Sequence, residues 1–158
     1  MWLADPLRTR CLRTRFTRSA RRSPTAIVVV DLNGDVDARL RAAFTQVLRR
    51  CAPPSSHQVR LSASGFALLL PEINTPDAAY EVAGRLAASL GPILLDGRLV
   101  TLAAAIGVAA TPPAGLSHDA LLDRATRAMQ KAKSQGPDTR WAIWQDAPPA
   151  PSETGRAA

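Results

Sequence analysis

Few side chains in this chain have both the type and the spacing that catalysis or metal binding requires. The two histidines, His57 and His118, have no partners at the intervals of a metal site or a catalytic triad, so we expect both to be polar residues beside loops. The two cysteines are too few and too isolated for a disulfide framework or a zinc site. Cys51 falls on an apolar helical stripe and is expected to be a buried free thiol.

One acidic residue and one short turn stand out instead. Asp31 follows the β-branched run 26–30 (AIVVV), which is typical of a buried strand. Residues 62–65 (SASG) separate two apolar runs and predict a tight hairpin turn. Asp31 at the end of a strand could hold a ligand, but an aspartate there could equally cap a turn.

The elements that would position these residues alternate between strands and helices. Helical periodicity is predicted over 35–51, 75–90 and 117–135, and strands over 26–30, 57–61, 66–70, 93–95, 99–109 and 140–145. Asn33-Gly34-Asp35 is the turn and N-cap signal of the first helix, and Asp96-Gly97 is a hairpin signal. The central order βαββαβ predicts an α+β fold of the ferredoxin-like or palm type, with a mainly antiparallel sheet and helices on one face.

Positive charge is concentrated near the N-terminus of a chain whose net charge is +7. Residues 8–22 contain seven arginines and no acid, a block that can attract phosphate backbones or anionic lipid. Nucleic-acid binding is disfavoured because aromatic residues for base stacking are not interleaved. We therefore divide the chain into a basic arm (1–22), a folded domain (23–145) and a disordered tail (146–158). No apolar run is long enough to cross a membrane, and a cytoplasmic location is expected.

Five segments, in order and sensibly spaced, resemble the GGDEF domain of diguanylate cyclases. Residues 59–73 (VRLSASGFALLLPEI) resemble the signature hairpin of that family. The others are residues 5–16, which begin Asp-Pro-Leu, and the segments VVVDLNGD, VTLAAAIGVA and LLDRATRAMQKAKSQG. The resemblance covers residues 5–145 and implies a GGDEF-like fold for the folded domain.

The resemblance implies a chemistry whose residues are mostly replaced here. Family members join two GTP molecules into cyclic di-GMP, using two magnesium ions held by carboxylates. Asp31 matches a metal-binding aspartate. The signature Gly-Gly-Asp-Glu-Phe is replaced by Ser62, Ala63, Ser64, Gly65 and Phe66, so the second metal carboxylate and a glutamate are missing. Asp31 is then at most a weak, vestigial metal ligand.

Two further matches concern the nucleotide. Lys133 matches a phosphate-binding lysine, and Asp35 an aspartate that reads guanine, although about a dozen residues that the family has before that position are missing. Each has an ordinary explanation as well, because helix dipoles favour acids in the first turn and cations in the last. Pro53 and Ser56 stand at the positions of an Arg-x-x-Asp product-inhibition site, which argues against cyclic di-GMP binding there.

The sequence therefore predicts a degenerate, catalytically inactive GGDEF-domain protein that acts as a binding or scaffolding module in bacterial cyclic di-GMP or nucleotide signalling. No cofactor is expected. The alternatives are a GTP-binding pseudoenzyme or residual diguanylate cyclase, and nucleic-acid or membrane-surface binding through the arginine-rich arm. Expected partners are another protein or a second copy of the chain, with a nucleotide as a further ligand. Because the resemblance begins at Asp5, we expect regulation by a separate partner and not by an attached sensor domain.

Overall fold

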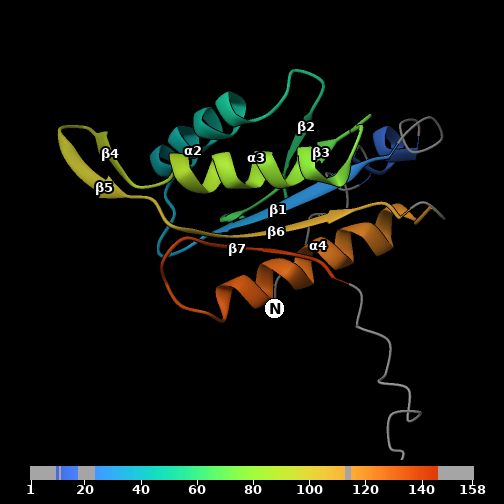
Figure 1. The fold of residues 1–158 in the computed structure, drawn as a ribbon. Coiled ribbons are helices and arrows are strands. Elements are labelled where there is room, and N and C mark those ends of the chain that lie inside the picture. The colour runs from blue at the N-terminus through green and yellow to red at the C-terminus, as the bar shows by residue number, and fades with distance from the viewer. Residues whose placement is uncertain (1–9, 11, 18–23, 113–114, 146–158) are drawn as a thin grey trace, which may run out of the picture.

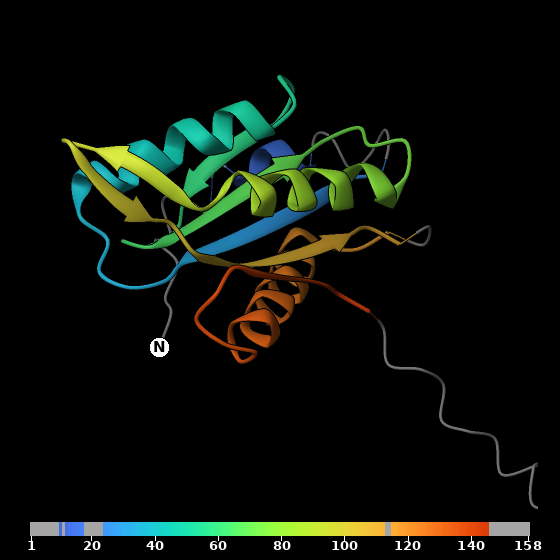
Figure 2. The ribbon, with the colours of Figure 1, turned by 60° about the vertical axis from the view of Figure 1, so that its left-hand side comes forward.

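The computed structural model describes residues 10, 12–17, 24–112 and 115–145. Within them lie a five-stranded sheet of order β2-β3-β1-β6-β7, a separate two-stranded hairpin, and helices on both faces of the sheet (Figures 1 and 2). The elements are, in chain order, β1 (Ala26–Leu32), α2 (Ala38–Cys51), β2 (His57–Arg60), β3 (Gly65–Leu70), α3 (Pro76–Ser89), β4 (Pro92–Leu95), β5 (Arg98–Thr101), β6 (Ala104–Ala110), α4 (His118–Lys133) and β7 (Arg140–Ile143).

β1 is the central strand, and both of its neighbours, β3 and β6, pair with it antiparallel. Alternate residues of β1 enter different cores. Val28 and Val30 pack with α2 and α3, whereas Ile27 and Val29 pack with α4. The helices therefore form two layers, which corrects the expected single helical face. A strand covered on both faces is apolar at every position, so its sequence does not say how many helical layers cover it.

The order of elements agrees with the predicted α+β arrangement. The last strand, β7, follows the central βαββαβ unit and adds an edge strand to its sheet. β7 pairs with β6 in parallel, and α4 makes the crossover between them. The α4 helix can approach β6 closely because Gly107 has no side chain. A Cβ added there would lie 2.1 Å from the carbonyl oxygen of Ala125. The lack of a side chain at Gly107 therefore sets how closely α4 packs on the sheet.

The helix starts follow local capping chemistry, with one correction. The carboxylate of Asp37 accepts a hydrogen bond from the backbone N–H of Leu40, so Asp37 caps α2 in place of the predicted Asp35. The last helix starts after Ser117, in agreement with the predicted start at 117, and the hydroxyl of Ser117 accepts from the N–H of Ala120. The segment Thr75-Pro76-Asp77 predicts a helix start with a capping hydroxyl, but at α3 the side chain of Thr75 makes no capping hydrogen bond.

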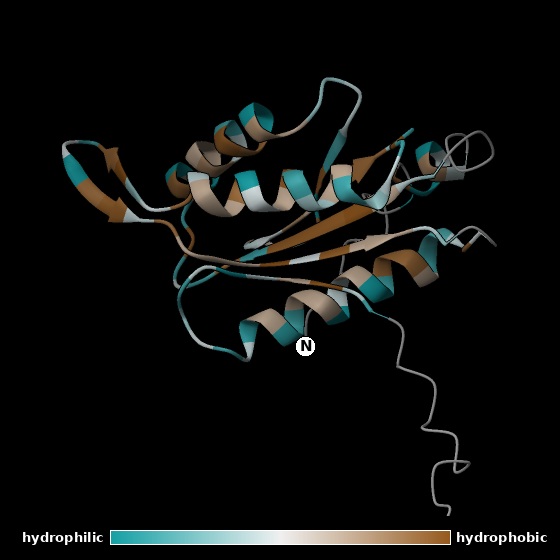
Figure 3. Cartoon of the chain, viewed as in Figure 1, coloured by the Kyte–Doolittle hydropathy of each residue, from teal (hydrophilic) through white to brown (hydrophobic). Residues whose placement is uncertain are grey.

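The expected strand 99–109 is two strands, β5 and β6, because the chain leaves the hairpin before it enters the main sheet. The predicted turn at Asp96-Gly97 is confirmed, with φ of 51° and 78° at its two residues. The β4–β5 hairpin projects from one end of the molecule (Figure 1). Its strands are coloured as hydrophobic in Figure 3, and Leu94 and Leu99 are 72% and 75% exposed.

Residues 12–17 are helical and contribute to the core beneath α4. Leu12 and Phe16 are buried there, and the ring of His118 packs edge-on against Phe16 with centroids 5.4 Å apart. His118 is thus a buried residue and not the loop-side residue that we expected. Asp119 forms an ion pair with Arg13, with a nitrogen–oxygen distance of 2.9 Å.

Cys11 and the tail 146–158 lie outside the described residues, whereas Cys51 is buried, as predicted.

A membrane-spanning helix was also sought. Among the residues that the structure describes, no helix has the length and apolar character needed to cross a bilayer.

Candidate functional site

Asp31, Ser64 and Lys133 meet at one end of the central strand. Asp31 lies in β1 directly opposite Gly65 of β3, so the turn before β3 falls beside its carboxylate. The hydroxyl of Ser64 donates to Oδ1 of Asp31 at 2.6 Å. The ammonium of Lys133 donates to Oδ2 at 2.5 Å. We call these three residues the Asp31 cluster.

The alternation of side chains between the two faces of β1 explains why Lys133 reaches Asp31. Asp31 alternates with Ile27 and Val29, and both of these face α4. Lys133 is the last residue of α4, and it approaches the strand from that same face. The structure therefore brings together two of the predicted site residues, Asp31 and Lys133, with the serine of the signature-like turn.

In the Asp31 cluster, the buried carboxylate of Asp31 is paired with hydrogen-bond donors from the chain itself. The side chain of Asp31 is 5% exposed, whereas that of Lys133 is 53% exposed. A carboxylate removed from water needs hydrogen-bond donors or an opposite charge to stay ionised. Here each oxygen of Asp31 has a donor, one neutral and one cationic. The cluster is complete without an added ligand.

The turn at 62–65 is held by its own hydrogen bonds. The hydroxyl of Ser62 accepts from the N–H of Gly65 at 2.8 Å, and the carbonyl of Gly65 accepts from the N–H of Leu61. The guanidinium of Arg41, from α2, donates to the carbonyl of Ala63 at 3.2 Å. These contacts fix Ser64 beside Asp31. Phe66, the last residue of the signature-like segment, is buried against Phe44 of α2.

Asp35 stands apart from the Asp31 cluster. It is exposed, in the loop between β1 and α2, and it does not cap the helix. The same loop is fastened to the chain beyond α4, because the side-chain amide of Asn33 donates to the carbonyl of Pro137 at 2.6 Å. Sequence reasoning missed Asn33 and Arg41 as residues that shape this edge, since both act through backbone carbonyls that no motif marks.

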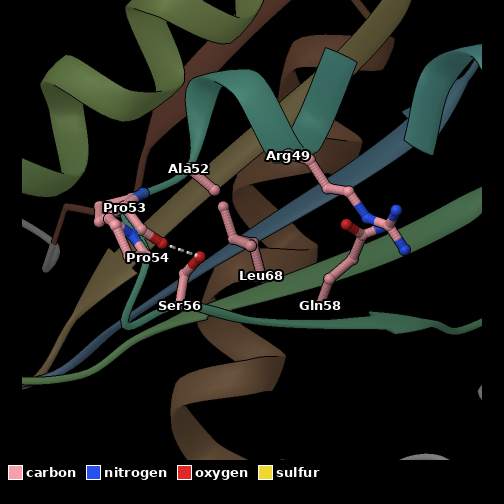
Figure 4. Close-up of a pocket in the computed structure, with 7 residues that line it drawn as sticks. All are labelled: Arg49, Ala52, Pro53, Pro54, Ser56, Gln58 and Leu68. Carbon is pink, nitrogen blue, oxygen red and sulfur yellow. Dashed lines mark hydrogen bonds between the residues drawn. The ribbon is translucent and has the colours of Figure 1, made fainter. Parts of the chain in front are cut away.

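A hollow of about 310 Å³ lies on the other side of the hairpin formed by β2 and β3. It is lined by Arg49, Ala52, Pro53, Pro54, Ser56, Gln58 and Leu68 (Figure 4). The hydroxyl of Ser56 donates to the carbonyl of Pro53 at 2.6 Å, so its proton is used locally. Arg49 is the only charged group in this lining. The hollow contains the two positions at which the sequence resemblance would place a product-inhibition site.

The sheet order, the two helical layers and a site at the end of the central strand define an α+β domain of the palm type. The family model described as "Diguanylate cyclase, GGDEF domain" matches residues 35–139. The chain therefore belongs to the GGDEF family, as the sequence predicts.

Solved structures of this family have the same fold. The GGDEF domain of TpbB (YfiN) from Pseudomonas aeruginosa is 24% identical, with a TM-score of 0.78 over 90% of this chain and 94% of that one. The active GGEEF domain of a diguanylate cyclase from Vibrio cholerae is 14% identical, with a TM-score of 0.75 over 93% and 100%. The diguanylate cyclase SiaD of P. aeruginosa, in complex with its activator SiaC, is 19% identical, with a TM-score of 0.65 over 88% and 61%. A search of curated proteins found no match.

Proposed function

We propose that this chain is a GGDEF-family member that does not synthesise cyclic di-GMP and that acts as a binding or scaffolding module in bacterial cyclic di-GMP signalling. The observation that carries the proposal is the Asp31 cluster. The one carboxylate that matches a metal ligand of the family is already bonded to Ser64 and Lys133.

The donors at this site do not fit a pair of magnesium ions. Magnesium requires a tight octahedron of oxygen ligands, with carboxylates among them. The Asp31 cluster offers one carboxylate and one hydroxyl, and the ammonium of Lys133 adds a positive charge beside them. No group of three or more His, Cys, Asp or Glu side chains that could hold a metal is found in the described part of the chain. We therefore derive no catalytic step through magnesium.

The expected loss of rate is large. Removing a single preorganised electrostatic group typically lowers kcat by about 10²–10³. The resemblance places Ser64 and Gly65 where two acidic residues stand in the family, so two such groups are replaced. We expect the loss of both groups to lower the rate further than the loss of one.

A binding role is consistent with what family members do with other proteins. The structure of SiaD was solved in complex with an activator protein, SiaC. A chain that keeps the fold of the domain can present a surface on which a protein docks, whether or not it keeps the chemistry.

The direct test is to incubate the purified protein with GTP and magnesium and to separate the products by chromatography. An active diguanylate cyclase treated in parallel is the positive control. We expect no cyclic di-GMP from this chain, and clear turnover would refute the proposal. Calorimetry with GTP and magnesium tests the alternative of a GTP-binding pseudoenzyme. Heat of binding without turnover would favour that alternative.

Binding through the arginine-rich arm is the other alternative, and the structure sharpens its test. Leu12 and Phe16 belong to the core, so deleting residues 1–22 would also damage the fold. Arg13 and Arg15 are engaged with Asp119 and His57. Replacing exposed arginines by glutamine is therefore the better experiment, with the loss of salt-dependent binding to DNA or anionic vesicles as the readout.

A further inference from the structure

A second hollow lies along α2 and shares no lining residue with the Asp31 cluster. It has a volume of about 320 Å³ and is lined by Ala43, Gln46, Val47, Arg50, Cys51, Ser89, Ile93 and Leu94. These residues come from α2, the last turn of α3, and β4. We call this hollow the hairpin groove, because the β4–β5 hairpin forms one of its walls.

The wall formed by the hairpin is apolar on both sides, and only one side serves the fold. Ile93, Leu95 and Val100 pack against the core above the sheet and anchor the hairpin. Leu94 and Leu99 lie directly opposite each other across the two strands, and both are exposed. Three large hydrophobic side chains are exposed in the described part of the chain, and these are two of them. A single exposed leucine is ordinary, but an adjacent pair beside a groove is typical of a binding surface.

The rim of the groove is basic. Arg50 lines it, and Arg85 reaches its edge, where its guanidinium donates to the carbonyl of Cys51 at 3.4 Å. The acid of the hairpin, Asp96, is already bonded to Arg39 of α2. The lining itself contains no acidic residue.

These observations select one class of occupant. A second copy that docked by the same surface would bring the two sets of arginines together, on a chain that already carries a net charge of +7. A nucleotide would lack an aromatic side chain on which to stack, since the lining is aliphatic and polar. A largely apolar hollow with the guanidinium of Arg50 in its lining and that of Arg85 at its edge instead complements an apolar side chain flanked by carboxylates.

We propose that the hairpin groove binds a protein partner through a short segment that combines leucine-like side chains with several aspartates or glutamates. The apolar side chain enters the groove against Val47 and Ile93, and the carboxylates pair with Arg50 and its neighbours. The inference rests on the proposed function of a binding module, and it adds the surface and the chemistry of the partner. The groove is separate from the Asp31 cluster, so the two can be tested independently.

The test is a selection of short random peptides, displayed on phage, against the whole protein. Selected peptides are then synthesised and measured by fluorescence polarisation against Arg50→Glu, Arg50→Gln, Leu94→Ser and the matched control Lys131→Glu. Lys131 is an exposed cation on α4, in the helical layer on the opposite face of the sheet. Thermal unfolding of each variant verifies that it is folded.

We expect the selected peptides to be rich in acidic and large apolar residues. Arg50→Glu and Leu94→Ser should each weaken binding by about tenfold or more, Arg50→Gln by less, and Lys131→Glu by less than about twofold. The proposal is overturned if no peptide is enriched, if the peptides lack this composition, or if Lys131→Glu weakens binding as much as Arg50→Glu does.

Two competing ligands are measured in the same assay. If vesicles containing anionic lipid displace the peptide from the wild type, and direct vesicle binding is lost in Leu94→Ser, the hairpin would be assigned to a membrane surface and the proposal overturned. Binding of cyclic di-GMP that is lost in Arg50→Glu, without peptide binding, would overturn it as well. Neither result bears on whether the protein turns over GTP, so failure of this inference is distinguishable from failure of the proposed function.

Discussion

The ammonium nitrogen of Lys133 lies 2.5 Å from a carboxylate oxygen of Asp31, although the two residues are 102 positions apart in the chain. The end of the last helix is thereby joined to the end of the central strand by an internal ion pair. Ser64 completes the arrangement from the neighbouring turn, 2.6 Å from the other oxygen. A site that the family resemblance associates with metal and nucleotide is, in this chain, a closed set of contacts between its own side chains.

Removing the cation should destabilise the fold. Lys133→Met leaves the buried carboxylate of Asp31 with one donor, and we expect a loss of roughly 1–2 kcal/mol of unfolding free energy, since Lys133 is itself half exposed. Urea unfolding gives the value. In the double variant Asp31→Asn/Lys133→Met part of the loss should return, because no uncompensated charge remains. Lys131→Met is the control, and an equal effect there would exclude a specific role for the ion pair.

Adding a second carboxylate should create a weak response to magnesium. In Ser64→Asp the new acid lies beside Asp31, so like charges repel and the melting temperature should fall in metal-free buffer. Millimolar magnesium should restore part of that loss in Ser64→Asp and leave the wild type unchanged at matched ionic strength. A wild-type protein that magnesium stabilises as much as the variant would contradict the account of the Asp31 cluster given above. No cyclic di-GMP is expected from either protein.

Gly107 should tolerate no side chain. A Cβ would lie 2.1 Å from the carbonyl oxygen of Ala125 and 2.2 Å from the amide nitrogen of Met129, so α4 would have to move off β6. We expect Gly107→Ala to cost about 3 kcal/mol or more. Gly84→Ala, on α3, is the matched control, because its Cβ meets no atom within 4 Å. That change should stabilise the protein by roughly 0.5–1 kcal/mol.

Acidification should destabilise the protein before its carboxylates titrate. Burial lowers the pKa of His118 from its ordinary value of 6.5 and outweighs the hydrogen bond and charge of Asp119, while the charge of Arg13 lowers it further. Burial and the charge of Arg15 likewise lower the pKa of His57. The unfolded chain therefore binds more protons than the folded one below pH 6.5, and stability should fall as the pH drops below that value.

The carboxyl of Asp119 adds to this trend at lower pH. Its hydrogen bond with His118 is the largest of the effects that lower its pKa below 3.8, so the stability it contributes is present above that value and lost as the pH falls through the folded pKa. Denaturant unfolding over this pH range measures both parts. In His57→Gln/His118→Gln the decline that begins near neutrality should disappear. The acidic part should become smaller, because the hydrogen bond with His118 that lowers the pKa of Asp119 is removed as well. An unchanged profile would show that the histidines are not responsible.

The sequence predicted the family and most elements because both depend on local patterns. Such patterns lie within a few residues of one another. Examples are the strand at 26–30, the helix start at Ser117 and the hairpin turn at Asp96-Gly97. Two helical layers, by contrast, could not be inferred from β1, which is apolar at every position from Ala26 to Val30. The sequence places the cap of α2 in Asn33-Gly34-Asp35, whereas the structure places it at Asp37. Aspartate suits the capping position at either residue, and only the path of the loop decides between them.

The candidate site could be predicted in part. Asp31, Ser64 and Lys133 were all singled out from the sequence, but their mutual contact was not, since it depends on the register of β1 against β3 and on the length of α4. The burial of His118 was missed for a similar reason, because Phe16, which packs against it, lies in residues 1–22, which the sequence places in an arm outside the folded domain. Contacts between distant segments leave no periodic trace in a single sequence.

The outermost strands of the sheet, β2 and β7, have four residues each, whereas the interior strands have six or seven. Short edge strands offer few unpaired backbone groups to another sheet, and they resist the edge-to-edge pairing of sheets that leads to aggregation. If the chain binds other proteins as proposed, short edge strands are an advantage, since non-specific strand pairing would compete with binding of the partner. Assembly is then left to side chains, which can discriminate between companions as a bare backbone cannot.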